Sequence, residues 1–322
     1  MPVGLPLPEL AEFLRRCEDA GFHGVGIHDH PHSGRDVYLA LARAASRTTR
    51  LTLYPATSNP VSRHPVELAT LAHSLEELAP GRVRLTVAPG FLAVRSIGRP
   101  RATVDVMRDA VVKIRRLLAG DAVQFGATST RLRHTSARPT PVYMLAAGPR
   151  MVELAGEVAD GVFLMVGFHP DSIAAARRHL AAGAHRGGRD PGAIPTIFVV
   201  TIALEEDVNA ARRWPRRWFA PGQSFLTYPS RANLYWLRAA GIDLPDNHVP
   251  EEISDDLAAR ICDTFGVFGS PEYCARRLRQ MQQEAGVQHV LLFPAHTKDG
   301  AYEMPEREVA AFRDAIRPRL RR

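Results

Sequence analysis

Short apolar runs alternate with amphipathic segments along most of the chain. The apolar runs are rich in β-branched residues and are continuous or nearly so, which is typical of parallel strands buried on both faces. They lie at 24–27, 50–56, 82–88, 141–145, 161–166, 196–202 and 289–293. Segments with helical spacing of apolar residues lie between them, at 8–20, 35–47, 64–78, 103–118, 149–158, 170–186, 205–213, 271–284 and 305–316.

Repeated strand–helix units with short links predict an α/β fold, a single (β/α)8 TIM barrel that spans residues 1–322. Only the stretch PVGLP precedes the first helix, so the first strand is curtailed. Residues 214–262 contain three tryptophans and several prolines and glycines, and they predict a helical insertion after the seventh strand. This insertion would form a lid or substrate wall, and its aromatic residues suit a planar substrate, a dimer contact or a plain hydrophobic cover.

The composition is that of an ordinary globular protein, with 45% hydrophobic and 23% charged residues. The net charge is +7, and Lys113 and Lys298 are the two lysines among 41 basic residues. The arginines are dispersed and form no basic stripe with interleaved aromatic residues, so we expect no nucleic-acid binding. A mildly positive field does suit small anionic ligands.

The cysteines and the chain start indicate a cytoplasmic protein. Cys17, Cys262 and Cys274 lie far apart without a CxxC spacing, which is typical of reduced thiols and not of a disulfide or zinc framework. The chain has no run of about 18 apolar residues that would cross a membrane. Its first residues, MPVGLPLPEL, lack the basic and apolar regions of a signal peptide.

The stretch GIHDHPHSGRDVY, residues 26–38, is unusually rich in histidine and follows a predicted strand. Active sites of such barrels lie at the C-terminal ends of the strands. His28 and His30 alternate along the chain and share a face, so they could begin a metal site with His169 and Asp299 as further ligands. The same stretch is also consistent with a solvated turn or with a loop that docks a cofactor.

A second candidate is AAGPRMVELAGEVADG, residues 146–161, where a strand ends and a helix begins at Pro149. Backbone N–H groups at a helix start, approached past a residue without a side chain, form a phosphate seat. Gly148 is that residue here, and Gly167 follows the next strand. The two glycines indicate a phosphate-bearing cofactor, whereas Gly148 alone is also explained by a simple tight turn.

Five stretches carry signatures of a known family: DHPHSGRDVY (29–38), ATSNPVSRHP (56–65), LAPGR (78–82), AAGPRMVELAGEVADG (146–161) and FGSPEYCARRLRQMQQEAGV (268–287). In this order they resemble the bacterial luciferase-like superfamily, in the branch of coenzyme F-420-dependent methylenetetrahydromethanopterin reductase. The resemblance implies a (β/α)8 barrel that binds a deazaflavin or flavin at the strand C-termini, and a homodimer.

The resemblance also assigns residues to the cofactor. They are Asp29, His30, Ala56, Thr57, Asn59, Ala147, Gly148 and Gly167. Asp29 and His30 would lie by the ring system, and a non-prolyl cis peptide would join Ala56 to Thr57. Arg35, Asp36 and Arg63 would instead pin helix starts and loops.

His30 is the candidate catalytic residue, because an imidazole with a pKa of about 6.5 can donate or accept a proton near neutrality. The alternative is that it only forms a hydrogen bond to the cofactor. The chain departs from the family pattern at His28, at Ala56, at residues 88–90 (Ala-Pro-Gly) and in its short first strand.

The function expected from these residues and the resemblance is a coenzyme F-420-dependent oxidoreductase that transfers a hydride between carbon 5 of the deazaflavin and a small organic substrate. The first alternative is an FMN-dependent luciferase-like monooxygenase. A metal-dependent hydrolase on the same barrel and an inactive cofactor-binding relative are further alternatives. The sequence does not name the substrate.

Overall fold

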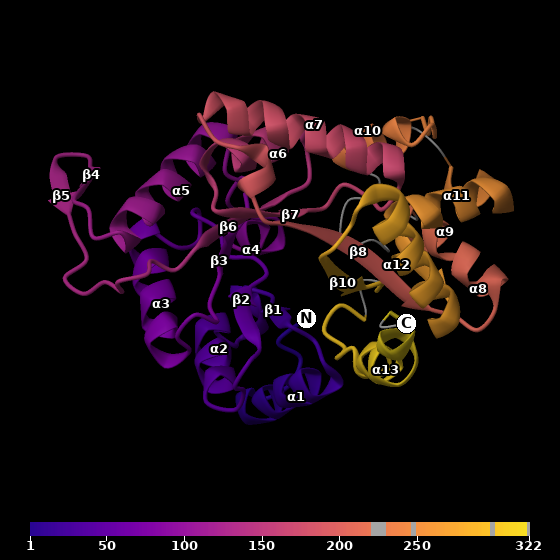
Figure 1. Ribbon diagram of the computed structural model, residues 1–322, viewed down its shortest axis with the longest axis horizontal. Coiled ribbons are helices and arrows are strands. Elements are labelled where there is room, and N and C mark those ends of the chain that lie inside the picture. The colour runs from indigo at the N-terminus through magenta and orange to yellow at the C-terminus, as the bar shows by residue number, and fades with distance from the viewer. Residues whose placement is uncertain (220–229, 246–248, 297–299, 321–322) are drawn as a thin grey trace. The chain divides into compact units, whose positions relative to one another are not determined.

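The computed structural model describes residues 1–219, 230–245, 249–296 and 300–320 (Figure 1). The Cα positions group into two units. The first comprises Met1–Leu145, Leu154–Val162 and Ala184–Pro195, and the second comprises Ala146–Glu153, Phe163–Gly183 and Thr196–Arg322. Four elements contain residues of both units: β6 (Val142–Ala146), α6 (Pro149–Val158), β7 (Gly161–Leu164) and α7 (Pro170–Arg186).

The first unit begins with helices and strands that lie close to the predicted ranges, except for a short helix at Leu92–Arg95 that was not predicted. They are α1 (Leu7–Ala20), β1 (Gly24–Ile27), α2 (Val37–Ala45), β2 (Thr52–Pro55), α3 (Pro65–Leu78), β3 (Leu85–Val87), α4 (Leu92–Arg95) and α5 (Val104–Leu118). Strands β1 and β2 are parallel, with Gly24 opposite Thr52 and Ile27 opposite Pro55. Since parallel strands end at the same edge of a sheet, the loops that follow β1 and β2 emerge side by side.

Local sequence explains where these helices begin and end. Helix α1 buries Leu10, Phe13 and Leu14 on one face and ends at Gly21, whose φ of 93° is left-handed and favours glycine. Helix α2 begins after Asp36, whose side chain accepts hydrogen bonds from the first turn. Asp36 therefore fixes the point at which the loop after β1 ends.

The segment before α1 forms no strand in residues 1–6. It lies beside β1, because the carbonyl of Met1 accepts a hydrogen bond of 2.9 Å from the N–H of His28. Val3 in this segment is fully buried. In place of the expected short first strand, residues 1–6 form an irregular segment, and Val3 of this segment is part of the core.

A short antiparallel hairpin, β4 (Val123–Phe125) and β5 (Thr128–Thr130), was not among the predicted elements. Four of its six strand residues are exposed or half-exposed and polar, so the apolar pattern of a buried strand is missing. It follows α5 and precedes β6, which pairs in parallel with β3.

The second unit is built on β8 (Thr196–Leu204), which pairs in parallel with β10 (Val290–Pro294) and β9 (Gly266–Gly269). Strand β9 was not predicted, because it is only four residues long and directly follows helix α11 (Asp255–Phe265). Helix α12 (Pro271–Ala285) begins at the Ser270 cap and ends at Gly286, as expected. The chain continues through α13 (Glu306–Ala311), a π-helix (Phe312–Ile316) and α14 (Arg317–Leu320).

The described part of the predicted insertion is helical and packed. It contains α9 (Trp214–Phe219), α10 (Arg231–Ala239) and α11, and it follows α8 (Val208–Arg212). Leu234, Leu237 and Ile261 belong to a buried apolar cluster together with residues of β8 and β9. Trp236 is fully buried and its indole N–H donates to the carbonyl of Ala147 at 2.6 Å, so this aromatic residue packs the fold and does not line a substrate wall.

None of the helices within the described residues combines the length and the apolar character that crossing a membrane would require.

Candidate functional site

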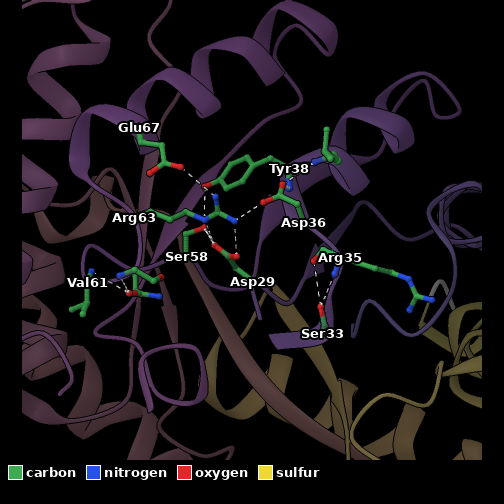
Figure 2. A network of polar contacts seen from close by, with 12 residues as sticks. Asp29, Ser33, Arg35, Asp36, Tyr38, Ser58, Val61, Arg63 and Glu67 are labelled. Atoms are coloured by element: carbon green, nitrogen blue, oxygen red, sulfur yellow. Dashed lines mark hydrogen bonds and ion pairs between the residues drawn. The ribbon is translucent and has the colours of Figure 1, made fainter. Parts of the chain in front are cut away.

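The loop after β1 is held by a buried ion pair. Asp29 is 2% exposed, and its carboxylate accepts hydrogen bonds from Arg63 at 2.8 Å (Nε) and 3.0 Å (Nη2). This two-pronged contact is the strong geometry for an arginine and a carboxylate. The hydroxyl of Ser58 donates to the same carboxylate at 2.7 Å (Figure 2). Both carboxylate oxygens of Asp29 are therefore engaged by protein groups.

Arg63 also reaches the start of α2. Its Nη2 donates to Asp36 Oδ2 at 2.7 Å, while Asp36 Oδ1 caps the helix by accepting from the N–H groups of Tyr38 and Leu39 (Figure 2). The guanidinium carbon of Arg63 lies over the Tyr38 ring, 5.0 Å from the ring centroid. The Tyr38 hydroxyl lies 2.9 Å from Ser58 Oγ. One arginine thus joins the loop after β1, the start of α2 and the loop after β2.

Electrostatics favour the charged state of this network. Burial acts to raise the pKa of Asp36, but hydrogen bonds from Arg63 and from the Leu39 and Tyr38 N–H groups outweigh it and hold that pKa below its usual value. Burial acts to lower the pKa of Arg63, but its hydrogen bonds to the two aspartates raise it above the usual value. Burial raises the pKa of the Tyr38 phenol, so this hydroxyl stays protonated.

The loop after β2 contains a cis peptide bond between Ala56 and Thr57, at the position that the resemblance implied. Asn59 follows it and is fully buried. Its Oδ1 accepts from the N–H groups of Val61 at 3.1 Å and Ser62 at 2.8 Å, which fixes the orientation of the carboxamide. Its Nδ2 has no hydrogen-bond partner within the described residues.

Thr86 in the neighbouring strand β3 is 1% exposed, and its hydroxyl is also without a partner in the described part of the chain. The backbone carbonyl of Thr86 accepts from the Ser58 N–H at 3.1 Å, which places β3 directly beside the loop after β2. A buried polar group without a partner is unusual in a folded protein. Asn59 and Thr86 therefore offer two uncommitted hydrogen-bonding groups on adjacent strand ends.

The three histidines of the loop after β1 lie in a row. The ring centroids of His28 and His30 are 5.0 Å apart, and those of His30 and His32 are 5.4 Å apart and stacked. His30 and His28 are half-buried, and His32 is exposed. A short 3-10 turn (Pro31–Ser33) follows His30.

Within the part of the chain that the structure describes, no set of metal ligands gathers around these histidines. The described residues include no group of three or more histidine, cysteine, aspartate or glutamate side chains that could hold a metal ion. His169, one proposed ligand, instead accepts a hydrogen bond from the Asp171 N–H at the start of α7. Asp299, the other, lies outside the described residues.

The phosphate candidates lie in the second unit. Gly148 directly precedes α6, and a Cβ added to it would meet no atom within 4 Å. The space next to this backbone is therefore open. The preceding residue, Ala147, commits its carbonyl to the indole of Trp236.

Gly167 behaves differently. Its φ is 90°, and a Cβ at this position would lie 2.7 Å from the backbone carbonyl oxygen of Thr264. The next N–H, that of Phe168, donates to the same carbonyl at 2.5 Å. Close packing against Thr264 is thus enough to explain why glycine stands here, without any ligand.

Sequence reasoning placed Asp36 and Arg63 correctly as residues that pin a helix start and loops. It missed Ser58 and Tyr38 as members of the buried network. Both lie within the stretches that carry the family signatures, so the sequence did mark these positions. What it could not show is that the Ser58 hydroxyl lies between Tyr38 and Asp29, which precede it by 20 and 29 residues.

Known proteins are similar to this chain over most of its length. A model of the luciferase-like monooxygenase family matches residues 2–289. The chain is 32% identical over 225 residues to the 5,10-methylenetetrahydromethanopterin reductase of Methanolobus tindarius. That alignment covers 64% of this chain and 65% of the reductase, so it spans a little under two thirds of the relative's length.

Solved structures match over nearly the whole chain. The coenzyme F-420-dependent tetrahydromethanopterin reductase of Methanopyrus kandleri superposes with a TM-score of 0.75 at 19% identity, covering 99% of this chain and 97% of that one. The oxygenating component of 3,6-diketocamphane monooxygenase from Pseudomonas putida, solved with FMN, gives 0.66 at 16% identity, covering 97% and 92%. At these identities the likeness establishes the α/β fold with its parallel strands.

Proposed function

Because the chain belongs to the luciferase-like monooxygenase family, we propose that this enzyme is a coenzyme F-420-dependent oxidoreductase. It transfers a hydride between the deazaflavin and a small organic substrate. The similarity to F-420-dependent reductases supports the choice of cofactor. Three expectations from the sequence stay predictions: the closed (β/α)8 barrel, the single domain and the homodimer. The parallel strands and the nearly full coverage by solved structures support the barrel.

The observation that carries this proposal is the carboxamide of Asn59. It is fully buried, its oxygen is held by two backbone N–H groups, and its nitrogen is a donor without a partner in the described residues. Leaving a buried donor unpaired costs about 1–3 kcal/mol. A planar heterocycle with ring carbonyl oxygens would supply the missing acceptor, and a deazaflavin carries such oxygens.

The residues present fit the cofactor. Within the first unit, His30, Ala56, Thr57 and Asn59 would hold the ring. Within the second unit, the open space beside Gly148 is a separate candidate for the phosphate. Asp29 acts as a positioning residue, since both of its oxygens are taken by Arg63 and Ser58. When bound, the deazaflavin supplies a carbon that carries hydride and reacts poorly with oxygen.

His30 would hold or move the proton that accompanies hydride transfer. It emerges directly after β1, and its neighbour Asp29 is fixed by the ion pair, so the backbone that carries the imidazole is held firmly. An imidazole near neutral pH serves as either acid or base. His32, whose ring stacks on that of His30, is exposed and serves as its matched control.

The test compares His30→Ala with His32→Ala in protein loaded with coenzyme F-420. Small alcohols, aldehydes and unsaturated carbonyl compounds are screened for change in the deazaflavin's visible absorbance. With a substrate found this way, His30→Ala should lower kcat roughly 100-fold, the lower range for general acid–base catalysis. His32→Ala should change it little.

Two outcomes would change this assignment. If His30→Ala weakens cofactor binding but leaves turnover at saturation intact, the imidazole only holds the ring. If both variants lose activity together and zinc restores either of them, the loop is a metal site and the hydride-transfer proposal fails.

FMN is the second candidate, because a structure solved with FMN shares this fold. FMN in the same place would make the enzyme a monooxygenase, since flavin can activate oxygen. The likeness to F-420-dependent reductases places FMN second.

A further inference from the structure

A cavity of about 430 Å³ lies within the second unit, lined mainly by residues of α11 and α12. Its size is within the range of small-molecule sites, which runs from about 300 to 1,000 Å³. Three arginines line it: Arg260 on α11, and Arg276 and Arg277 on α12. None of the residues that we propose for the cofactor is part of this lining.

The charge of the cavity is positive. Asp263 is the carboxylate in its lining, and one of its oxygens accepts from the Tyr273 hydroxyl at 2.8 Å. Within the described parts of the chain, none of the three arginines forms an ion pair with a carboxylate. Other arginines, among them Arg15, Arg63 and Arg115, do form ion pairs with carboxylates.

Two of the arginines donate hydrogen bonds to neutral oxygens, and Arg276 lies over the Tyr273 ring, 5.9 Å from the ring centroid. Arg260 donates to the Gly241 carbonyl at 2.8 Å. Arg277 donates to the Gln280 side chain at 2.9 Å and, through longer contacts of 3.4 and 3.5 Å, to the carbonyls of Phe168 and Asp263. These contacts hold the Arg277 guanidinium in place without neutralising its charge.

Arg277 also has an uncommitted donor. Its Nε is buried and has no hydrogen-bond partner within the described residues. Nε and a terminal nitrogen of a guanidinium together form the fork that fits two oxygens of a phosphate or carboxylate. The Arg277 side chain is half-buried, and its buried Nε could be satisfied by an anionic partner.

We propose that this cavity binds a small molecule through a phosphate group, held by Arg260, Arg276 and Arg277. The positive lining, the cavity volume and the free Nε of Arg277 each support an oxyanion ligand. The site goes beyond the proposed function, because it is a second anion site in addition to the cofactor's. The ligand is either free phosphate or a phosphate monoester, and the experiment separates these two sources.

Calorimetric titration of the full chain without cofactor tests this proposal, with chloride holding the ionic strength constant. The probes are inorganic phosphate and glycerol 3-phosphate. Both should bind saturably, and Arg260→Met, Arg276→Met and Arg277→Met should each raise Kd roughly tenfold or more. Tighter binding of glycerol 3-phosphate than of phosphate identifies a monoester as the ligand, and the reverse identifies free phosphate.

Arg178→Met is the matched control, because Arg178 is an exposed arginine of α7 outside the cavity lining. It should leave Kd unchanged. Arg260 and Arg276 are exposed, so their variants keep the test valid even if Arg277→Met fails to fold.

Three results would overturn the proposal. The first is the absence of saturable binding. The second is an equal loss of phosphate affinity in the Arg178→Met control, which would mean that binding depends only on the net charge of the protein. The third is an equal loss of coenzyme F-420 affinity in the Arg260 and Arg276 variants, which would assign these arginines to the cofactor. Because the phosphate titration contains no cofactor, its result stands whether or not the chain uses coenzyme F-420.

Discussion

At the scale of single residues, Arg63 organises the loops around the candidate site. Its guanidinium contacts Asp29 after β1 and Asp36 at the start of α2, and the Arg63 side chain is 14% exposed. A buried charge pair of this kind contributes little net stability compared with an apolar pair, but breaking it leaves an unpaired charge. The main role of Arg63 is therefore to fix the geometry of the loop after β1 and the start of α2.

Replacing Arg63 by Met should lower the free energy of unfolding by about 3–5 kcal/mol, because Asp29 is then a buried carboxylate without its partner. Arg63→Lys should recover only part of this loss, since an ammonium cannot form the two-pronged contact. Urea denaturation measures both values. Arg15→Met is the control, because Arg15 pairs with Glu12 and Asp19 on the exposed surface of α1 and should cost less than about 1 kcal/mol. A similar small loss for Arg63→Met would mean that the network is not stabilising.

At the scale of elements, the strands and helices that bury an apolar face could be predicted from the sequence. The range predicted for α6 matches the structure, and β1 lies at its predicted residues. The elements that were missed lack the pattern on which prediction depends. The β4–β5 hairpin is largely exposed, and β9 begins at Gly266, where a side chain would collide with the backbone of Thr201.

The candidate site could be predicted only in part. The family signatures located the loops after β1 and β2 and the cis peptide, since these depend on local sequence. The partners of Asp29 could not be predicted, because Ser58 and Arg63 meet it only when two strands pair in register. The sequence left the role of the tryptophans at 214–262 open, and the burial of Trp236 depends on packing against the distant Ala147.

The start of α6 provides a test at this scale. A Cβ on Gly148 would enter open space, so Gly148→Ala, →Val and →Leu should fold with nearly unchanged unfolding midpoints. They should lose coenzyme F-420 affinity progressively with side-chain size, by about 2 kcal/mol or more for the largest, as the phosphate loses close contact with backbone N–H groups. Fluorescence titration measures this series. Unchanged affinity across it would show that Gly148 serves only the turn.

At the scale of the whole molecule, the family and the α/β fold are established, and the cofactor is the main open choice. The fold accommodates both deazaflavin and flavin among the solved structures it resembles. Cofactor binding can be measured without knowing the substrate, so the cofactor is the property that can be measured first.

The central claim is tested most directly by titrating the purified, full-length protein with coenzyme F-420 and with FMN under identical conditions, following cofactor fluorescence. We predict saturable binding of coenzyme F-420, with a Kd at least tenfold lower than that of FMN, which corresponds to about 1.4 kcal/mol. Equal or tighter binding of FMN would contradict the account and assign the enzyme to the monooxygenases.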